Sequence, residues 1–228
     1  MQSASALDTA AFARLGACFF ALGALGLIAT SVFYVLAGPV AALPGGADNV
    51  TQALAATPSA AGWMQLAGLT GMPSDILLAL GAGLFALHEY RRGMPLAFSG
   101  WLALAVASVM FVFVDAVVAK VLPPVAAQAG AGAAYAGLRA LFDVLFAFGA
   151  LTAGGGALAA AWRTDGAVFR WSAVGWGLRL AGLVCLLASA SYLLGGPGAA
   201  LIGPGIALLA IVSLGIAAAY AREGLVTS

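Results

Sequence analysis

Apolar runs alternate with short polar breaks along the whole chain, and this pattern predicts membrane-spanning helices. A spanning helix needs about 20 consecutive, mostly apolar residues. Six segments meet that requirement, namely residues 14–37, 73–91, 97–121, 137–161, 171–194 and 201–221. Glycine, proline and charged residues separate them, as in HEYRRGMP at 88–95. We therefore expect one all-α domain over residues 1–228, a polytopic six-helix transmembrane bundle.

The first break is the longest and covers residues 38–72. Its part from 60 to 71 is amphipathic, which favours a short helix on the membrane surface. Pro73 would then suit the start of the second span, because a proline in the first helical turn gives up no hydrogen bond. The sequence thus predicts a long outer loop before the second span.

Composition places the chain in the bilayer and narrows its function. It is 64% hydrophobic and 7% charged, whereas soluble domains carry about 25% charged residues. The net charge of +1 gives no argument for nucleic acid as a partner. The single histidine excludes bis-His haem and His-rich zinc sites, and no phosphate-binding loop or dinucleotide fingerprint is present. We expect no cofactor, and the inventory disfavours an enzyme.

The distribution of basic residues predicts the orientation, since cytoplasmic loops are enriched in Lys and Arg. One side of the predicted bundle holds Arg14, Arg91, Arg92, Arg163, Arg170 and Arg222. The other side holds Lys120 and Arg139. Both termini are therefore expected in the cytoplasm, with the chain as a multi-pass protein of the inner (plasma) membrane.

Two similar segments suggest an internal repeat. Residues 75–82 read DILLALGA and residues 143–150 read DVLFAFGA, with five of eight positions identical. Both runs lead to an Arg-bearing loop and then to a Gly-Trp pair that enters the next span. Spans two and three are thus predicted to be a parallel copy of spans four and five. The alternative is a chance match in an Ala/Gly/Leu-rich chain.

Charged residues inside the spans are candidates for a binding site, because a charge in hydrocarbon is costly. Asp75, Asp115, Arg139 and Asp143 are all expected toward the outer ends of their helices, where Tyr34 also lies. We hypothesise that these four charged residues line an outward-facing polar pocket. The acids outnumber Lys120 and Arg139, so at least one acid lacks an obvious basic partner.

In an alternative account, these residues have a structural role and do not line a binding site. Arg139 and Asp143 are four apart and can pair on one helix face, and Asp75 can border a helix start, where a carboxylate suits the helix dipole. Arg179 either snorkels to the cytoplasmic headgroups or faces the bundle as an anion contact. His88 and Glu89, at the end of the second span, are expected to be solvated.

The segments ARLGACFFALGAL (13–25) and PSDILLALGAGLFAL (73–87), with the helix pair around FAFGAL and WSAVGWGLRLAGL, resemble a bacterial family of small six-helix membrane proteins. That family is known only as a domain of unknown function. The resemblance implies an inner-membrane location and carries over no site residue.

Two function classes follow. The first is a membrane protein that binds or transports a small molecule or ion through the outward pocket. The second is a non-catalytic accessory or regulatory subunit, packed against a membrane protein partner. A six-helix protomer is small for a transporter, so the first class also suggests a homo-oligomer. The first requires Asp115 and Asp143 to converge on a cavity. The second requires every polar group to be paired and an apolar, small-residue face to be left free.

Overall fold

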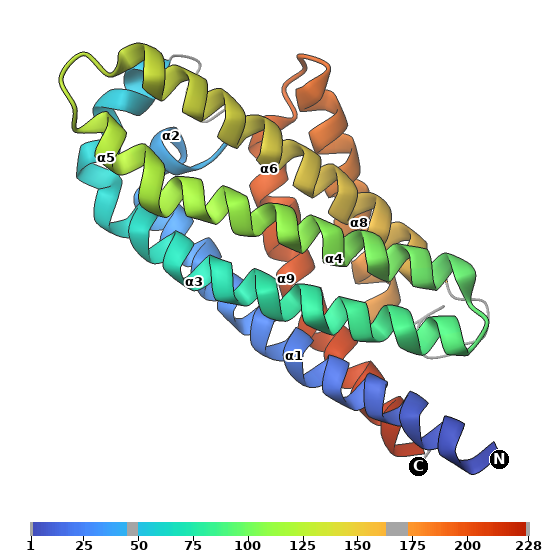
Figure 1. Cartoon of the computed structure of the whole chain (residues 1–228). Coiled ribbons are helices and arrows are strands. Elements are labelled where there is room, and N and C mark those ends of the chain that lie inside the picture. Colours follow the sequence, from blue (N-terminus) through green and yellow to red (C-terminus); the bar gives the residue numbers. More distant parts are fainter. Residues whose placement is uncertain (1, 45–49, 163–172, 227–228) are drawn as a thin grey trace.

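The structure of the protein, a computed structural model, describes residues 2–44, 50–162 and 173–226, and over these residues it contains helices and no strand (Figure 1). The long helices are α1 (Gln2–Ala37), α3 (Val50–Arg91), α4 (Pro95–Ala116), α6 (Gly132–Ala161), α8 (Ala173–Leu193) and α9 (Ala199–Val226). Shorter ones are α2 (Pro39–Ala42), the π-helix η1 (Val117–Val121) and α5 (Leu122–Ala126). Six helical segments are long and apolar enough to cross a membrane. This confirms the all-α six-helix bundle.

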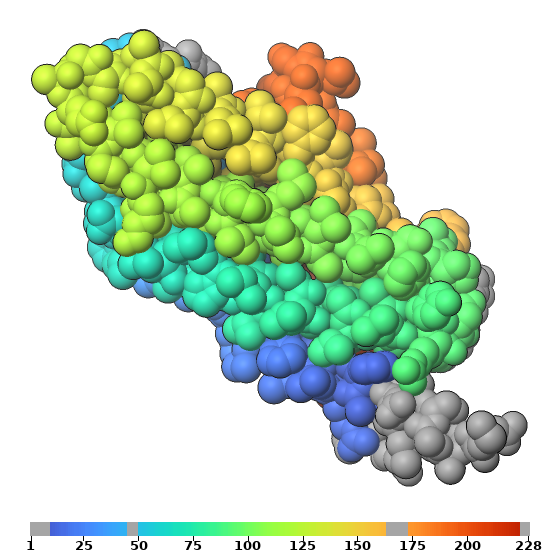
Figure 2. Space-filling model, viewed as in Figure 1, coloured from blue at the N-terminus to red at the C-terminus, as the bar shows by residue number. Residues whose placement is uncertain are grey.

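The six long helices form a closed ring in which chain neighbours are spatial neighbours. Contacts run from α1 to α3, α4, α6, α8 and α9 in turn, and α9 returns to α1. Successive helices run in opposite directions, so α1 begins where α9 ends (Figure 1). We call this the terminal end and the opposite one the α2 end. Figure 2 shows α3, α4 and α6 packed side by side along one face of the ring.

The predicted outer loop at 38–72 is mostly helix, which corrects the sequence interpretation. Helix α3 begins at Val50 and runs unbroken through Pro58 and Pro73 to Arg91. Its added portion is rich in alanine, and Ala53, among others, is buried in the bundle. Neighbouring helices and side chains can satisfy the backbone groups that a proline frees in a membrane helix. At 42 residues α3 is about 63 Å long, which exceeds the roughly 30 Å of hydrocarbon.

The third predicted span also extends further than expected. Helix α4 passes into the π-helix η1 and then α5, so helical structure continues to Ala126 instead of ending at Val121. Pro123 and Pro124 are the second and third residues of α5, and the π-helical turn η1, with its bond from the Leu122 N–H to the Val117 carbonyl, comes directly before them. The predicted repeat of helix pairs is neither confirmed nor contradicted by this architecture, and it stays a prediction.

The interior divides into two apolar clusters along the bundle axis. One, toward the terminal end, contains Phe20, Phe85 and Trp101 together with many alanines. The other, toward the α2 end, contains Tyr34, Met64 and Phe146 among its members. On α3 the clusters meet between Ala67 and Leu78, and on α4 between Ala107 and Val114. Polar side chains collect at this junction, near the middle of the bundle.

Candidate functional site

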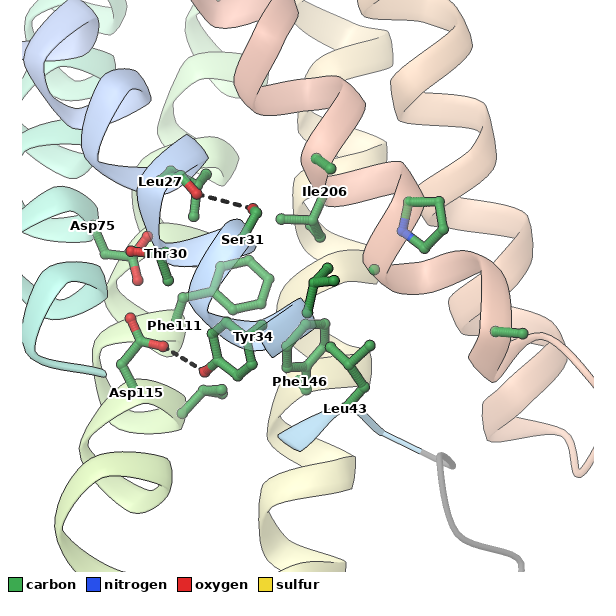
Figure 3. A pocket seen from close by; sticks show the side chains of 16 residues that line it. Leu27, Thr30, Ser31, Tyr34, Leu43, Asp75, Phe111, Asp115, Phe146 and Ile206 are labelled. Carbon is green, nitrogen blue, oxygen red and sulfur yellow. Dashed lines mark hydrogen bonds between the residues drawn. The ribbon is translucent and has the colours of Figure 1, made fainter. Parts of the chain in front are cut away.

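A cavity of about 310 Å³ lies on the α2 side of the junction between the two apolar clusters (Figure 3). It is lined from α1, α3, α4, α6, α9 and the residue after α2. Its polar members are Thr30, Ser31, Tyr34, Asp75 and Asp115, and the rest are apolar side chains such as Leu27, Phe111, Phe146 and Ile206. Mostly apolar walls with a few convergent polar groups are typical of small-molecule sites.

Two acids contributed by neighbouring helices meet in the wall of this cavity. Asp75 of α3 is 1% exposed and Asp115 of α4 is 4% exposed. Their carboxyl groups face each other within hydrogen-bonding reach (Figure 3). The Tyr34 hydroxyl on α1 donates a hydrogen bond of 2.7 Å to Asp115 Oδ1. Three helices thus converge on one acid pair.

One oxygen of each carboxyl group lacks a hydrogen-bond donor among the described residues. Asp75 Oδ2 and Asp115 Oδ2 are buried and have no hydrogen-bond donor among the residues that the structure describes. Ionised carboxylates only accept hydrogen bonds, and two adjacent negative charges repel strongly at low dielectric. Either one group carries a proton, shared between the two, or a cation lies against them.

Glycines on α3 make this approach of the two helices possible. A Cβ atom at Gly71 would overlap the Asp115 carboxylate, and one at Gly68 would overlap the Asp115 backbone carbonyl. The two glycines are three residues apart and therefore lie on one helix face. Small residues at this spacing let membrane helices pack at close range. The acid pair thus depends on the absence of side chains at these positions.

Hydroxyl groups surround the pair without neutralising it. The Thr30 and Thr70 hydroxyls are 3.0 Å apart and link α1 to α3. Ser74 Oγ donates to the Thr70 carbonyl at 2.5 Å. Thr30 and Ser31 donate within α1 to backbone carbonyls one turn earlier. These hydroxyl groups have hydrogen-bond partners within their own helix or the neighbouring one. The carboxyl groups of Asp75 and Asp115 therefore remain the strongest acceptors in the cavity that lack a full set of donors.

The structure separates the four charged residues that the sequence grouped. Asp75 and Asp115 line the cavity, whereas Arg139 and Asp143 do not. Arg139 Nε lies 3.2 Å from Asp143 Oδ1 on the same helix, and the Tyr192 hydroxyl also hydrogen-bonds Asp143. Asp115 therefore converges on Asp75 rather than on Asp143, and the pairing interpretation fits Arg139 and Asp143.

Arg139 also holds the short segment that follows α1. Its guanidinium donates to the Ala41 carbonyl at 2.6 Å and to the Leu43 carbonyl. Leu43 is itself a wall of the cavity. A planar guanidinium serves several acceptors at once, so Arg139 positions one side of the cavity without lining it.

Arg179 fits neither sequence alternative closely. It donates to the Ala161 carbonyl at 2.9 Å, at the end of α6, and its guanidinium stacks 5.2 Å from the Trp176 ring centre. The last carbonyls of a helix lack intrahelical donors, so a basic side chain there completes the helix end. Arg179 joins α8 to α6 and lies apart from the cavity.

The terminal end holds a buried network that the sequence analysis placed in solvent. Glu89 is 0% exposed and His88 is buried. The Tyr220 hydroxyl donates to Glu89 Oε1 at 2.5 Å and accepts a bond of 2.8 Å from the Trp101 indole. The prediction of solvated His88 and Glu89 was wrong because α9 covers that end of α3. Trp101 is a core residue here.

The contacts of Asp115 with the Tyr34 hydroxyl and with the Asp75 carboxyl group were not predicted from the sequence. Tyr34 and Asp115 are 81 residues apart on helices that are not chain neighbours. One signal was present: Asp143 has a base one turn earlier, in Arg139, while Asp75 and Asp115 have none at that spacing. The two acids without a base one turn away were therefore the ones to expect in contact with each other.

These features define the class of the protein: an integral membrane protein built as a six-helix bundle, with a mid-bundle cavity that contains a buried acid pair. No family model, curated protein or solved structure matches the chain. The resemblance to a bacterial six-helix family stays a prediction. No three His, Cys, Asp or Glu side chains gather as metal ligands within the described parts of the chain.

Proposed function

We propose that the protein binds a small organic cation in this cavity, as a membrane receptor or carrier whose ligand arrives from the outer side. The observation that carries the proposal is the pair of adjacent, buried carboxyl groups of Asp75 and Asp115, whose Oδ2 atoms lack donors within the described residues. A positive group placed against them would supply the missing donor or charge. Charge-assisted contacts of this kind are about twice as strong as neutral ones.

The walls favour an organic ligand over a bare metal ion. Besides the two carboxyls, the cavity offers the hydroxyls of Thr30, Ser31 and Tyr34, and its remaining lining is apolar. Hard cations take six or more oxygen ligands, which this lining does not supply. An ammonium group on an apolar body matches both parts of the site.

The arrangement of the membrane spans supports access from one side. The Arg bias favours a cytoplasmic position for the terminal end, and in that orientation the cavity would face outward. On the terminal side a void of about 30 Å³ adjoins Asp75, room for about one water molecule. The aromatic cluster of Phe85, Trp101 and Tyr220 closes the path beyond it. An accessory role would require every buried polar group to have a partner. The acid pair does not meet this requirement, because its carboxyl groups lack a full set of donors among the described residues.

The test uses two probes of the same shape that differ in charge. Phenyltrimethylammonium is a permanent cation, and tert-butylbenzene is its uncharged isostere. For purified protein in nanodiscs, calorimetry should show about ten- to a hundredfold tighter binding of the cation, because its trimethylammonium charge, which has no N–H to donate, is attracted electrostatically to the carboxyl groups in a site of low dielectric. In Asp115→Asn and Asp75→Asn that preference should collapse.

The matched control is Glu223→Gln, an acid at the terminal end that pairs with Arg92. This variant should keep the full preference for the cation. Equal binding of the two probes to the wild type, or an unchanged preference in both aspartate variants, would refute the proposal.

A further inference from the structure

We infer that the cavity opens sideways into the bilayer between α1 and α9, and that its ligand is a single-chain cationic amphiphile. Its head would lie at the acid pair and its tail would leave through this seam. The inference rests on the proposed cation site and adds the class of ligand and its route. It is carried by a second hollow, which shares three lining residues with the cavity.

The second hollow is a groove of about 280 Å³ on the outside of the bundle. It is lined from α1 by Ile28, Ser31, Val32, Val35 and Leu36, and from α9 by Ala207 and Ile211. Ser31, Val35 and Ala207 also line the inner cavity. The two spaces therefore share a rim, and that rim is the seam between α1 and α9.

The groove faces lipid. Val35 is 71% exposed and Ile211 is 60% exposed, and no charged side chain lines the groove. At this depth of a membrane-spanning bundle the surroundings are acyl chains, so these apolar surfaces need no protein cover. An alkyl chain in the groove would replace a lipid chain at little cost.

The seam is open here because α9 presents small residues and α1 diverges from it. Ala200, Gly203 and Ala207 line the cavity from α9, together with the larger Pro204 and Ile206. Toward the terminal end the same two helices pack tightly, with Phe20 of α1 and Tyr220 of α9 in one core cluster. Figure 1 shows the two ribbons close at the terminal end and apart toward the α2 end.

Charge and polarity along this route match one kind of molecule. The inner end holds two carboxyl groups with no basic side chain in the cavity lining, and the outer end is entirely apolar except for Ser31. A cationic head of modest size with one long alkyl tail satisfies both ends at once. An anionic amphiphile would bring a third negative group to Asp75 and Asp115.

The experiment compares tails that fit inside the cavity with tails that do not. Butyltrimethylammonium and hexadecyltrimethylammonium compete against radiolabelled phenyltrimethylammonium for protein in nanodiscs, with each concentration expressed as that in the bilayer. In the wild type the long cation should compete at least as well as the short one. In Ile211→Trp, which fills the groove at a residue that does not line the inner cavity, the apparent affinity of the long cation should fall about tenfold or more, while that of the short cation changes by less than about threefold.

Leu187→Trp is the matched control, because Leu187 is an exposed lipid-facing residue of α8, away from the seam. Val32→Trp fills the groove from the α1 side, also at a residue outside the cavity lining, and should reproduce Ile211→Trp. The lateral route would be overturned if the wild type did not bind the long cation. It would also be overturned if the seam variants bound both cations with the same affinities as Leu187→Trp. The cation site would stand in either case. If labelled phenyltrimethylammonium fails to bind the wild type, the proposed function itself fails.

Discussion

At the scale of single residues, the site depends on one acid contact and on the glycine that permits it. Asp75 and Asp115 come from different helices, 40 positions apart, and both are buried. Burial of a carboxyl group without a partner is costly, so such a pair persists only where the surroundings hold it in place. Gly71 and the Tyr34 hydroxyl are the contacts that hold Asp115.

Gly71→Ala should weaken both the fold and cation binding. The new methyl group would overlap the Asp115 carboxylate, so the acid or the helix must shift. Overpacking typically costs about 1–3 kcal/mol, and we expect a lower melting temperature together with about tenfold weaker phenyltrimethylammonium binding. Thermal unfolding and calorimetry measure the two effects.

Gly83→Ala on the same helix is the matched control, since a Cβ there meets nothing within 4 Å. Alanine is the better helix former by about 1 kcal/mol, so Gly83→Ala should be neutral or stabilising. Equal behaviour of the two alanine variants would show that the contact between Gly71 and Asp115 does not constrain the site.

At the scale of elements, the sequence predicted the helices that follow from the length of the apolar runs. It did not predict the features that depend on packing between helices. The six spans follow from run length, and the structure confirms six such helices. The continuation of α3 through Pro58 and Pro73 was not predicted, because burial against other helices outweighs the local cost of a proline. The pairing of Asp143 with Arg139 could be predicted from their spacing on one helix. The contact of Asp115 with Asp75 joins two helices and depends on how they pack, so spacing could not predict it.

Arg139 connects elements, and its replacement should show this. Its guanidinium bonds the Ala41 and Leu43 carbonyls and pairs with Asp143. Arg139→Gln removes a buried charge partner and should lower the free energy of unfolding by about 3–5 kcal/mol. Arg139→Lys keeps the charge but not the fork of donors, and should cost about 1–3 kcal/mol. Unfolding by SDS titration in mixed micelles measures both.

The control for this pair of variants is Arg92→Lys, at a half-exposed guanidinium paired with Glu223 across 3.4 Å. Exposed pairs contribute about 0–1 kcal/mol, so this change should be small. The assignment of Arg139 as a positioning residue would be wrong if Arg139→Lys were as mild as Arg92→Lys.

At the scale of the whole molecule, the bundle is asymmetric about its polar layer. The half toward the terminal end contains the packed aromatic side chains of Phe85, Trp101 and Tyr220 and a void of about 30 Å³. The half toward the α2 end holds the cavity of about 310 Å³ and the groove. Many transporters bind their substrates near the bilayer midplane, between parts that can close on either side. The larger space in the α2 half is the asymmetry that the proposed one-sided ligand access requires.

This asymmetry predicts which introduced thiols react with a water-soluble, membrane-impermeant reagent. With Cys18 and Cys185 replaced by alanine, Gly203→Cys should be modified by a cationic methanethiosulfonate added outside right-side-out vesicles. A Cβ at Gly203 has room, since its nearest neighbour is Leu43 at 3.8 Å. Ser213→Cys should stay unmodified, because Ser213 is buried beside the small void toward the terminal end. Phenyltrimethylammonium should slow the reaction at residue 203, since it would occupy the same space. Modification of residue 213 from outside, or of residue 203 only from the cytoplasmic face, would contradict the proposed orientation and access.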